Sequence, residues 1–221
     1  MNAPDGTAPA PLGDHYFTAQ PASADERRLI TVQLAGRELE VEVAPGVFSP
    51  HRIDLGTSVL LKQAPTPPPT GNLLDLGCGW GPLALTMALE SPAATVWAVD
   101  VNERARDLVR RNADRLGLAN VVTCAPHEVL DHLTFDALWS NPPIRIGKEA
   151  LHLMMQQWLP RLTASTLTDG CGAWMVVQKN LGSDSLARWI SEHLGDQGIS
   201  VTRKASSKGF RILHVTRQSQ A

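Results

Sequence analysis

The sequence is poor in the residues that mark secreted, metal-binding or membrane proteins. It has only three cysteines in 221 residues, Cys78, Cys124 and Cys171, and no two of them form a CxxC pair. This odd, widely spaced set gives no disulfide framework and no zinc site, so we expect buried thiols and no bound metal. No apolar run approaches the roughly 20 residues that span a bilayer. The N-terminus lacks the basic and apolar parts of a signal peptide. We therefore expect a soluble, cytoplasmic protein that makes no membrane contact.

The chain also lacks a large excess of charge of one sign. Its formal net charge is −2, which excludes a strongly basic, free-standing nucleic-acid binder. Segment 203–217 departs from this balance, because it holds five Lys and Arg residues and no Asp or Glu. It is either a solvated pair of strands or a face that contacts phosphates, and the sequence leaves both open. The seven histidines show no catalytic or ligand spacing, which gives no support to a hydrolase.

The order of the apolar segments predicts an α/β fold with a mostly parallel sheet covered on both faces. We expect helices at 82–89, 103–116, 148–161 and 185–194 and strands at 73–76, 95–99, 121–124, 135–140 and 173–178. Segments 199–205 and 210–216 flank Lys208-Gly209 and predict a closing antiparallel hairpin. The tryptophans of the strands, Trp97, Trp139 and Trp174, are expected in the core. Ligands of such sheets bind beyond the carboxyl ends of the strands.

A shorter region precedes this alternating part. Residues 1–13 are rich in Ala, Pro and Gly and are expected to form a flexible tail. Segments 29–34 and 38–43 predict a β-hairpin. A short helix through Gln63 follows, with Thr57 or a neighbour as its cap, and then a stiff Pro-rich linker. We expect 14–70 to be an N-terminal extension of one catalytic domain at 71–221, and not a separate domain.

A glycine-rich loop follows the first strand expected in the sheet. Residues 75–81 read Asp-Leu-Gly-Cys-Gly-Trp-Gly, and Pro82 opens the next helix. Glycines let the backbone turn sharply and approach a ligand closely. The GxGxG spacing fails the GxGxxG pattern of dinucleotide-binding folds and resembles the cofactor loop of S-adenosylmethionine-dependent methyltransferases. Trp80 either touches that cofactor or covers the start of the helix. Asp100, at the end of the second strand, either accepts the hydroxyls of a ribose or belongs to the N-terminal cap of the following helix.

A second loop, Asn141-Pro142-Pro143-Ile144, follows the fourth expected strand. Asn141 offers a side-chain carbonyl and Pro142 a backbone carbonyl, and the two prolines have fixed φ and no N–H. Such stiff acceptors can hold the N–H groups of an amide or a base so that the nitrogen lone pair points at a methyl donor. The other interpretation is an ordinary turn. Ile144 would give apolar contact without an aromatic face for stacking.

Taken together, these motifs resemble the small-domain methyltransferases typified by the catalytic half of the ribosomal small-subunit RNA methyltransferase C family, which methylates guanine N2 in 16S rRNA. The likeness runs from about residue 15 to 213. The shared stretches are His15-Tyr16-Phe17, Val47-Phe48-Ser49, Asp54-x-Gly56-Thr57, residues 75–81, Asp100-Val101-Asn102, residues 140–144 with Gly147-Lys148, and Lys208-Gly209-Phe210.

The resemblance implies a class I methyltransferase, a Rossmann-like three-layer sandwich with a seven-stranded sheet. It implies S-adenosylmethionine as cofactor, and rRNA or the small ribosomal subunit as partner. The acceptor-holding residues would be Asn141, Pro142, Pro143 and Ile144. The cofactor-binding residues would be Thr57, Asp75, Gly77, Cys78, Gly79, Gly81, Asp100, Val101 and Asn141. Relatives often place an acidic residue just after the third strand, near the adenine. Here either Glu128 or the backbone would take that place.

Two features depart from those rRNA enzymes. The sequence shows no counterpart of the degenerate methyltransferase-like domain that precedes their catalytic half, and it has Ile144 where they tend to have Phe. The expected activity is therefore N-methyl transfer, with a guanine amino group in rRNA as the first candidate. A protein-glutamine or small-molecule N-methyltransferase is the alternative, although a glutamine enzyme would be expected to have Tyr at 144 and a helical N-terminal domain. A non-catalytic module would be expected to have lost Asp75 or Asn141. The oligomeric state stays open.

Overall fold

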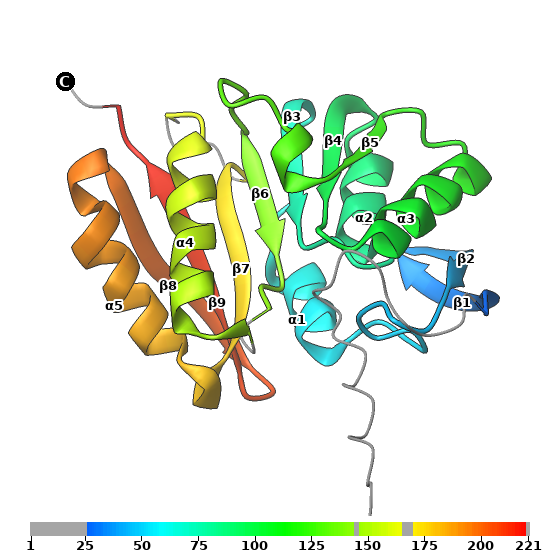
Figure 1. Ribbon diagram of the computed structural model, residues 1–221, viewed down its shortest axis with the longest axis horizontal. Coiled ribbons are helices and arrows are strands. Elements are labelled where there is room, and N and C mark those ends of the chain that lie inside the picture. Colours follow the sequence, from blue (N-terminus) through cyan, green and yellow to red (C-terminus); the bar gives the residue numbers. More distant parts are fainter. Residues whose placement is uncertain (1–25, 144–145, 165–169, 220–221) are drawn as a thin grey trace, which may run out of the picture.

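A seven-stranded sheet forms the centre of the molecule (Figure 1). The structure is a computed structural model and describes residues 26–143, 146–164 and 170–219. The strand order is β5-β4-β3-β6-β7-β9-β8. Strands β3 to β7 are parallel, and β9 runs antiparallel to both β7 and β8. This arrangement confirms the predicted α/β fold and its closing hairpin. The strands are β3 (Thr70–Leu76), β4 (Ala93–Val99), β5 (Val121–Cys124), β6 (Ala137–Ser140), β7 (Gly172–Gln178), β8 (Ile199–Ser207) and β9 (Phe210–Arg217).

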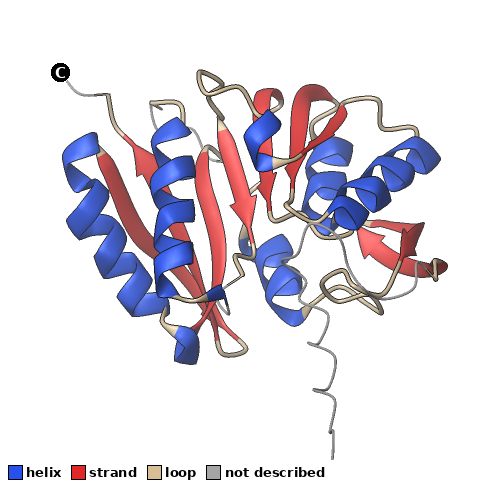
Figure 2. Cartoon of the chain, viewed as in Figure 1, coloured by secondary structure: helices blue, strands red, loops and turns tan. Residues whose placement is uncertain are grey.

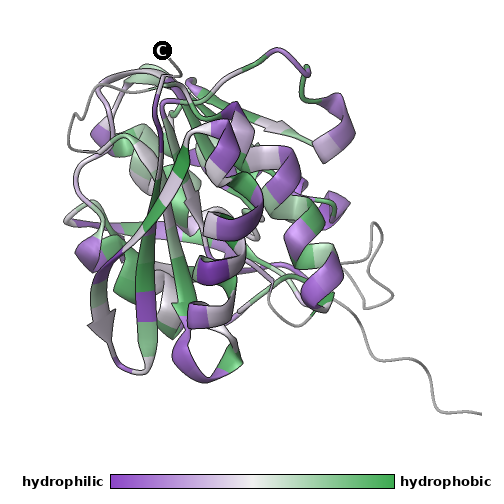
Figure 3. Ribbon diagram, turned by 90° about the vertical axis from the view of Figure 1, so that its left-hand side faces the viewer, coloured by the Kyte–Doolittle hydropathy of each residue, from purple (hydrophilic) through white to green (hydrophobic). Residues whose placement is uncertain are grey.

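Among the described residues, five α-helices cover the two faces of this sheet (Figure 2). One face carries α1 (Leu55–Gln63), α2 (Pro82–Glu90) and α3 (Glu103–Leu116), and the other carries α4 (Lys148–Trp158) and α5 (Ser183–Leu194). Short 3-10 turns lie between these elements: η1 (Pro126–Glu128), η3 (Leu159–Arg161), η4 (Lys179–Leu181) and η5 (Gly195–Gln197). Figure 3 shows hydrophobic strands between helices whose outer sides are largely hydrophilic.

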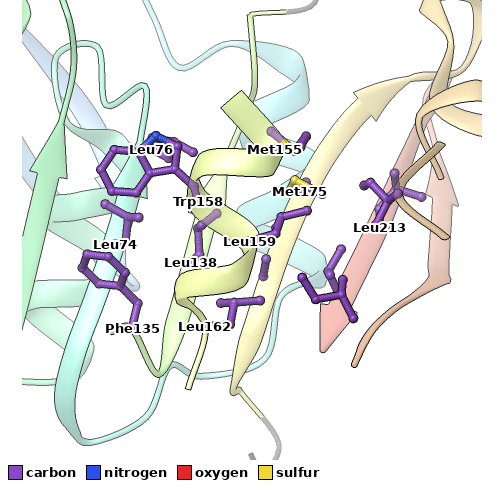
Figure 4. Close-up of a cluster of buried hydrophobic side chains, with 14 of the residues drawn as sticks. Leu74, Leu76, Phe135, Leu138, Met155, Trp158, Leu159, Leu162, Met175 and Leu213 are labelled. Carbon is purple, nitrogen blue, oxygen red and sulfur yellow. The ribbon is translucent and has the colours of Figure 1, made fainter. Parts of the chain in front are cut away.

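Two hydrophobic clusters hold the layers together, one on each face of the sheet. Neighbouring residues of β3 show the division, because Leu73 packs in the cluster under α1 and α2 while Leu74 packs in the cluster under α4 and α5. Both are fully buried. Figure 4 shows how Trp158 and Met155 of α4 lie over Leu138 and Met175 of the sheet. A parallel sheet covered on both sides needs such continuous apolar strands.

The N-terminal hairpin of β1 (Arg28–Leu34) and β2 (Arg37–Val43) forms a separate two-stranded sheet against α2 and α3. The buried Glu42 carboxylate accepts hydrogen bonds from Arg111 and Arg115 of α3, and the bond from Arg111 is the main cause of its lowered pKa. Asn112 accepts from the Glu42 N–H at 2.6 Å and donates to the carbonyl oxygens of Glu42 and Trp80. These contacts fix the hairpin to α3 and to the glycine-rich loop.

Some boundaries differ from the sequence-based expectations. The helix expected at 148–161 ends at Trp158 and continues as η3, because Pro160 has no N–H for an α-helical bond and its ring clashes with the preceding turn. The cap of α1 is Asp54, whose side chain accepts from the N–H groups of Gly56 and Thr57. Trp97 is only partly buried, unlike Trp139 and Trp174. The Cys171 thiol is likewise half-buried, whereas the other two are buried.

The part of the chain that the structure describes contains no helix long and apolar enough to cross a membrane. Over the same residues, no three His, Cys, Asp or Glu side chains group as metal ligands would.

Candidate active site

The glycine-rich loop and the Asn-Pro-Pro loop lie side by side at the carboxyl edge of the sheet. They follow β3 and β6, which are neighbouring parallel strands. The buried Ser140 hydroxyl, one residue before Asn141, donates to the carbonyl oxygen of Leu76 at 2.7 Å. Leu76 immediately precedes Gly77, so a single side-chain hydrogen bond joins the two loops at the points where they leave the sheet. Residues about sixty apart in the chain therefore form one site.

Gly77 and Gly81 of the first loop have different roles. The N–H groups of Gly77 and Cys78 both donate to the carbonyl oxygen of Val99, which folds the loop across the end of β4. Gly77 has a φ of 79° and is exposed, and a Cβ on it would meet no atom within 4 Å. Gly81 has a φ of 99°, and a Cβ there would lie 3.0 Å from Val109 of α3. Gly77 thus leaves open space for a ligand beside the backbone, whereas Gly81 allows α2 and α3 to pack closely.

Asp75 lies beneath the surface and links the strand before the glycine-rich loop to the helix after it. Its side chain is fully buried, and Oδ2 accepts from the N–H of Ala84 in the first turn of α2 at 2.8 Å. Burial raises the pKa of this carboxyl to about 8. Burial likewise raises the pKa of the Cys78 thiol. Both residues were predicted to bind the cofactor, and their positions favour an indirect contribution through the backbone of the loop.

Of the two roles considered for Asp100 from the sequence, the structure shows the one at the N-terminal cap of α3. Its Oδ2 accepts from the N–H of Gly79 at 3.0 Å, and its Oδ1 accepts from the N–H of Asn102 at 2.9 Å. Asn102 in turn caps α3 through the N–H groups of Arg104 and Ala105. Each carboxylate oxygen can still accept a further hydrogen bond, so a hydroxyl pair remains compatible with this geometry. Burial is the main cause of the raised pKa of Asp100.

Two apolar side chains near the glycine-rich loop stay exposed. Val101, directly after Asp100, is 44% exposed, and Phe48 is 42% exposed. Phe48 lies beside Gly79, because a Cβ on that glycine would come within 4.0 Å of the Phe48 Cβ. Sequence reasoning named Phe48 only as part of a shared motif and gave it no place in the site. Both side chains therefore leave apolar surface exposed close to this loop.

Trp80 and Glu128 have structural partners of their own. Trp80 is 1% exposed, packs in the cluster under the N-terminal hairpin, and donates from Nε1 to the Ser49 carbonyl oxygen at 3.2 Å. Of its two interpretations, the packing role is the one that its position favours. The Glu128 carboxylate accepts from the N–H of Ala125 at 2.5 Å, within the turn that follows β5.

The Asn-Pro-Pro loop is fixed by the N-terminus of α1. Asn141 is partly exposed and Pro142 is buried. The Asn141 Nδ2 donates to Oδ2 of Asp54 at 3.0 Å and to Oγ1 of Thr57 at 3.1 Å. Thr57, predicted to approach the cofactor, is buried and turned toward Asn141. Asp54 was missed as a site residue, and its only signal in the sequence was the Asp-x-Gly-Thr motif. Ile144 lies outside the described residues.

The model of the methyltransferase small domain matches residues 38–214. The chain belongs to the methyltransferase small domain family. This confirms the family predicted from the sequence and, with it, the predicted class of enzyme. The match begins inside β2, so it includes α1 and part of the N-terminal hairpin as well as the whole central sheet through most of β9.

Several relatives are 27% to 31% identical to the chain over the residues that align. It is 31% identical over 205 residues to the Uncharacterized protein YbxB of Bacillus subtilis (strain 168), covering 91% of this chain and 98% of that protein. It is 31% identical over 199 residues to the Ribosomal RNA small subunit methyltransferase C of Stutzerimonas stutzeri (strain A1501), covering 86% and 54%. For the Ribosomal RNA large subunit methyltransferase G of Vibrio campbellii, the identity is 27% and the coverage 83% and 47%. The chain thus spans about half the length of these two rRNA methyltransferases.

Solved structures show the same fold at lower identity. The T. thermophilus 16S rRNA N2 G1207 methyltransferase, in complex with AdoMet and guanosine, superposes with a TM-score of 0.69 at 18% identity, over 90% of this chain and 52% of that one. M. jannaschii TYW2 in complex with AdoMet gives a TM-score of 0.58 at 11% identity, over 91% and 96%. These likenesses confirm the class I methyltransferase fold.

Proposed function

We propose that the protein is an S-adenosylmethionine-dependent N-methyltransferase that modifies rRNA, with the exocyclic amino group of a guanine as its acceptor. The observation that carries this proposal is the bond between Ser140 and Leu76, which joins a ligand-accessible glycine loop to a rigid acceptor loop. A donor and an acceptor held on neighbouring strands are already close, and fixing both converts an encounter into a step between positioned groups.

The residues of the first loop fit the cofactor. Open space beside Gly77 admits a ligand to the backbone, the Asp100 carboxylate offers acceptors for hydroxyls, and Val101 gives an apolar surface for an adenine ring. When bound, S-adenosylmethionine supplies a methyl group activated by a sulfonium. Asp75 and Cys78, which are buried, would support the cofactor-binding loop without touching the cofactor. Gly79 and Gly81 would give the loop its backbone conformation.

The second loop would hold the acceptor nitrogen. Asn141 accepts one N–H of the amino group through Oδ1, and Pro142 accepts the other through its carbonyl oxygen. Pro142 and Pro143 keep this loop rigid, since neither proline can rotate about φ. The arrangement favours a pyramidal nitrogen and stabilises the positive charge that develops on it. The proton leaves to solvent after transfer, so the site needs no strong base.

Three exposed lysines favour a polyanionic substrate over a protein side chain. Lys148 begins α4, Lys179 follows β7, and Lys208 lies in the turn between β8 and β9, all at the carboxyl edge that holds Asn141. The backbone N–H of Lys179 donates to the Gly209 carbonyl oxygen, which keeps two of these turns together. We call the three the edge lysines. Their side chains have no ion-pair partner among the described residues.

The basic side chains of segment 203–217 differ in their surroundings. Arg203 lies 3.2 Å from the Asp184 carboxylate of α5, and Arg211 contacts the same carboxylate. Arg203 and Arg211 therefore pair with an acidic residue of the protein itself. Lys208, at the tip of the hairpin, is exposed at the edge and fits a phosphate contact.

The test combines cofactor binding with methyl transfer. Calorimetry with S-adenosylmethionine should show binding to one site. Transfer of a radiolabelled methyl group is then compared among small ribosomal subunits, free rRNA, ribosomal protein and a small-molecule amine. The proposal expects label in RNA and N2-methylguanosine in its nucleosides by mass spectrometry. Label in protein glutamine supports the alternative substrate, and cofactor binding without transfer to any acceptor points to a non-catalytic module.

A further inference from the structure

One carboxylate oxygen of Asp54 joins the start of α1 to the acceptor loop. Its Oδ2 accepts from the backbone N–H groups of Gly56 at 2.8 Å and Thr57 at 3.3 Å, as a helix cap does. The same atom accepts from Nδ2 of Asn141 at 3.0 Å, across 87 residues of sequence. The Thr57 hydroxyl oxygen provides a second acceptor for Nδ2 at 3.1 Å. Both N–H bonds of the Asn141 amide are thus directed at α1.

The oxygen of Asp54 that accepts from Asn141 determines which end of the Asn141 amide faces the helix. The two ends of an Asn amide have nearly the same shape, but the NH2 end only donates and the carbonyl end only accepts. An ionised carboxylate only accepts. Rotating the amide by half a turn would place its carbonyl oxygen against the Asp54 oxygen, with no proton between them. Asp54 therefore holds the NH2 end, and the Asn141 Oδ1 faces away from α1.

Gly56 shows that this approach of helix and loop is built into the sequence. Gly is a poorer helix former than Ala, yet Gly56 is the second residue of α1. A Cβ at this position would lie 3.0 Å from the Asp54 Oδ2, 3.0 Å from the Phe210 ring and 3.4 Å from the Asn141 Nδ2. The backbone conformation does not require glycine here. The missing side chain instead leaves room for three elements to meet around Asn141.

We propose that Asp54, with Thr57, is a positioning residue that selects the Asn141 amide orientation needed for methyl transfer. The inference rests on the proposed function, because it assigns the free Oδ1 to an acceptor N–H. Without Asp54, both amide orientations would be populated, and one of them presents a donor to a donor. The loss would fall on the methyl-transfer step and not on cofactor affinity.

The first test compares Asp54→Ser with Asp54→Asn. Serine retains a helix-capping oxygen on a shorter side chain, but it removes the carboxylate that faces Asn141. Asparagine can place its own carbonyl oxygen at the Oδ2 position and accept all three N–H groups. We expect Asp54→Ser to lower kcat by about 10- to 100-fold, with the Kd for S-adenosylmethionine and the thermal midpoint little changed. Asp54→Asn should recover most of the activity. Wild-type kcat in Asp54→Ser would overturn the inference.

A cycle with Asn141→Ala separates positioning from a general structural effect. If Asp54 acts through Asn141, then adding Asp54→Ser to Asn141→Ala should cause no further loss of kcat. Losses that multiply would show that Asp54 acts independently of Asn141, and would overturn the inference.

A readout without turnover keeps this inference distinct from the proposed function. The side-chain NH2 protons of Asn141, followed by 15N NMR in the free protein, should exchange slowly in the wild type and rapidly in Asp54→Ser. Equal exchange in both proteins would contradict the positioning role. If the wild type shows protected NH2 protons but methylates no RNA, the proposed function fails and the orientation of Asn141 stands.

Discussion

Asp75 provides the sharpest test of how the glycine-rich loop is held, through the dependence of stability on pH. The carboxyl has an ordinary pKa of 3.8 and a folded-state pKa of about 8, because burial disfavours its charged form. Between these two values, the folded protein keeps a proton that the unfolded chain has released. The contribution of this proton to the stability of the folded protein is therefore fully present below the pKa of the unfolded chain. It is lost as the pH rises toward 8.

The size of the effect follows from proton linkage. One extra bound proton in the folded state changes the unfolding free energy by about 1.4 kcal/mol per pH unit, or about 3 kcal/mol between pH 5 and pH 7. Asp75→Asn keeps an oxygen that accepts from the Ala84 N–H but cannot ionise. Its stability should therefore lose this slope, whatever its absolute level. Asp100, whose pKa is also raised by burial, adds the same slope to both proteins and cancels in the comparison.

The assay is urea unfolding at half-unit steps from pH 5 to pH 8, without cofactor, for the wild type and Asp75→Asn. Asp131→Asn removes an exposed carboxyl and serves as the control, because its slope should match that of the wild type. Parallel curves for the wild type and Asp75→Asn would refute the claim that Asp75 is protonated in the folded protein. Such a result would place a counter-charge or water beside its Oδ1, which has no hydrogen-bond partner among the described residues.

Three further predictions concern packing and substrate binding. Gly81→Ala should destabilise the protein by about 1–3 kcal/mol in chemical unfolding, because its Cβ would lie 3.0 Å from Val109 at a left-handed φ; unchanged stability would contradict the packing role of this glycine. Asn112→Ala should cost about 1–3 kcal/mol, because it removes the bonds to Glu42 and Trp80; hydrogen exchange should show the loss first in β1 and β2, and uniform loss would argue against a local clamp. Changing all three edge lysines to Gln should raise the KM for RNA. It should also reduce the slope of log affinity against log salt concentration by about 2, for three contacts to single-stranded RNA. The control Lys62→Gln, in the last turn of α1, should leave both quantities unchanged.

Much of the sheet and both loops of the candidate site were predictable because their residues carry strong local signals. Glycines with left-handed φ after an apolar strand indicate a tight loop, and consecutive prolines fix the backbone after Asn141. Alternation of strands and helices then places both loops at one edge. The end of α4 was harder to predict, since the apolar pattern continues through Pro160 and only that proline stops the helix.

What the sequence did not predict depends on contacts between distant segments. The approach of Asp54 to Asn141 requires α1 to pack on β7 and β9. A capping Asp in a sequence does not indicate whether its side chain also bonds a distant residue. The buried position of Asp75 was also hidden, because an acidic residue before glycines gives no sign of which way it points. Burial of this kind is a property of the assembled layers and cannot be read from local spacing.

The N-terminal hairpin limits how far the chain can be shortened and still fold by itself. A truncated chain starting at Thr70 would keep all seven strands, yet it would strip away the β1–β2 surface that covers Trp80 and its neighbours on α2 and α3. The indole would lose the Ser49 oxygen it bonds, and Asn112 would lose Glu42. An autonomous catalytic unit should therefore start no later than Arg28, and shorter versions should aggregate through the apolar side chains they uncover.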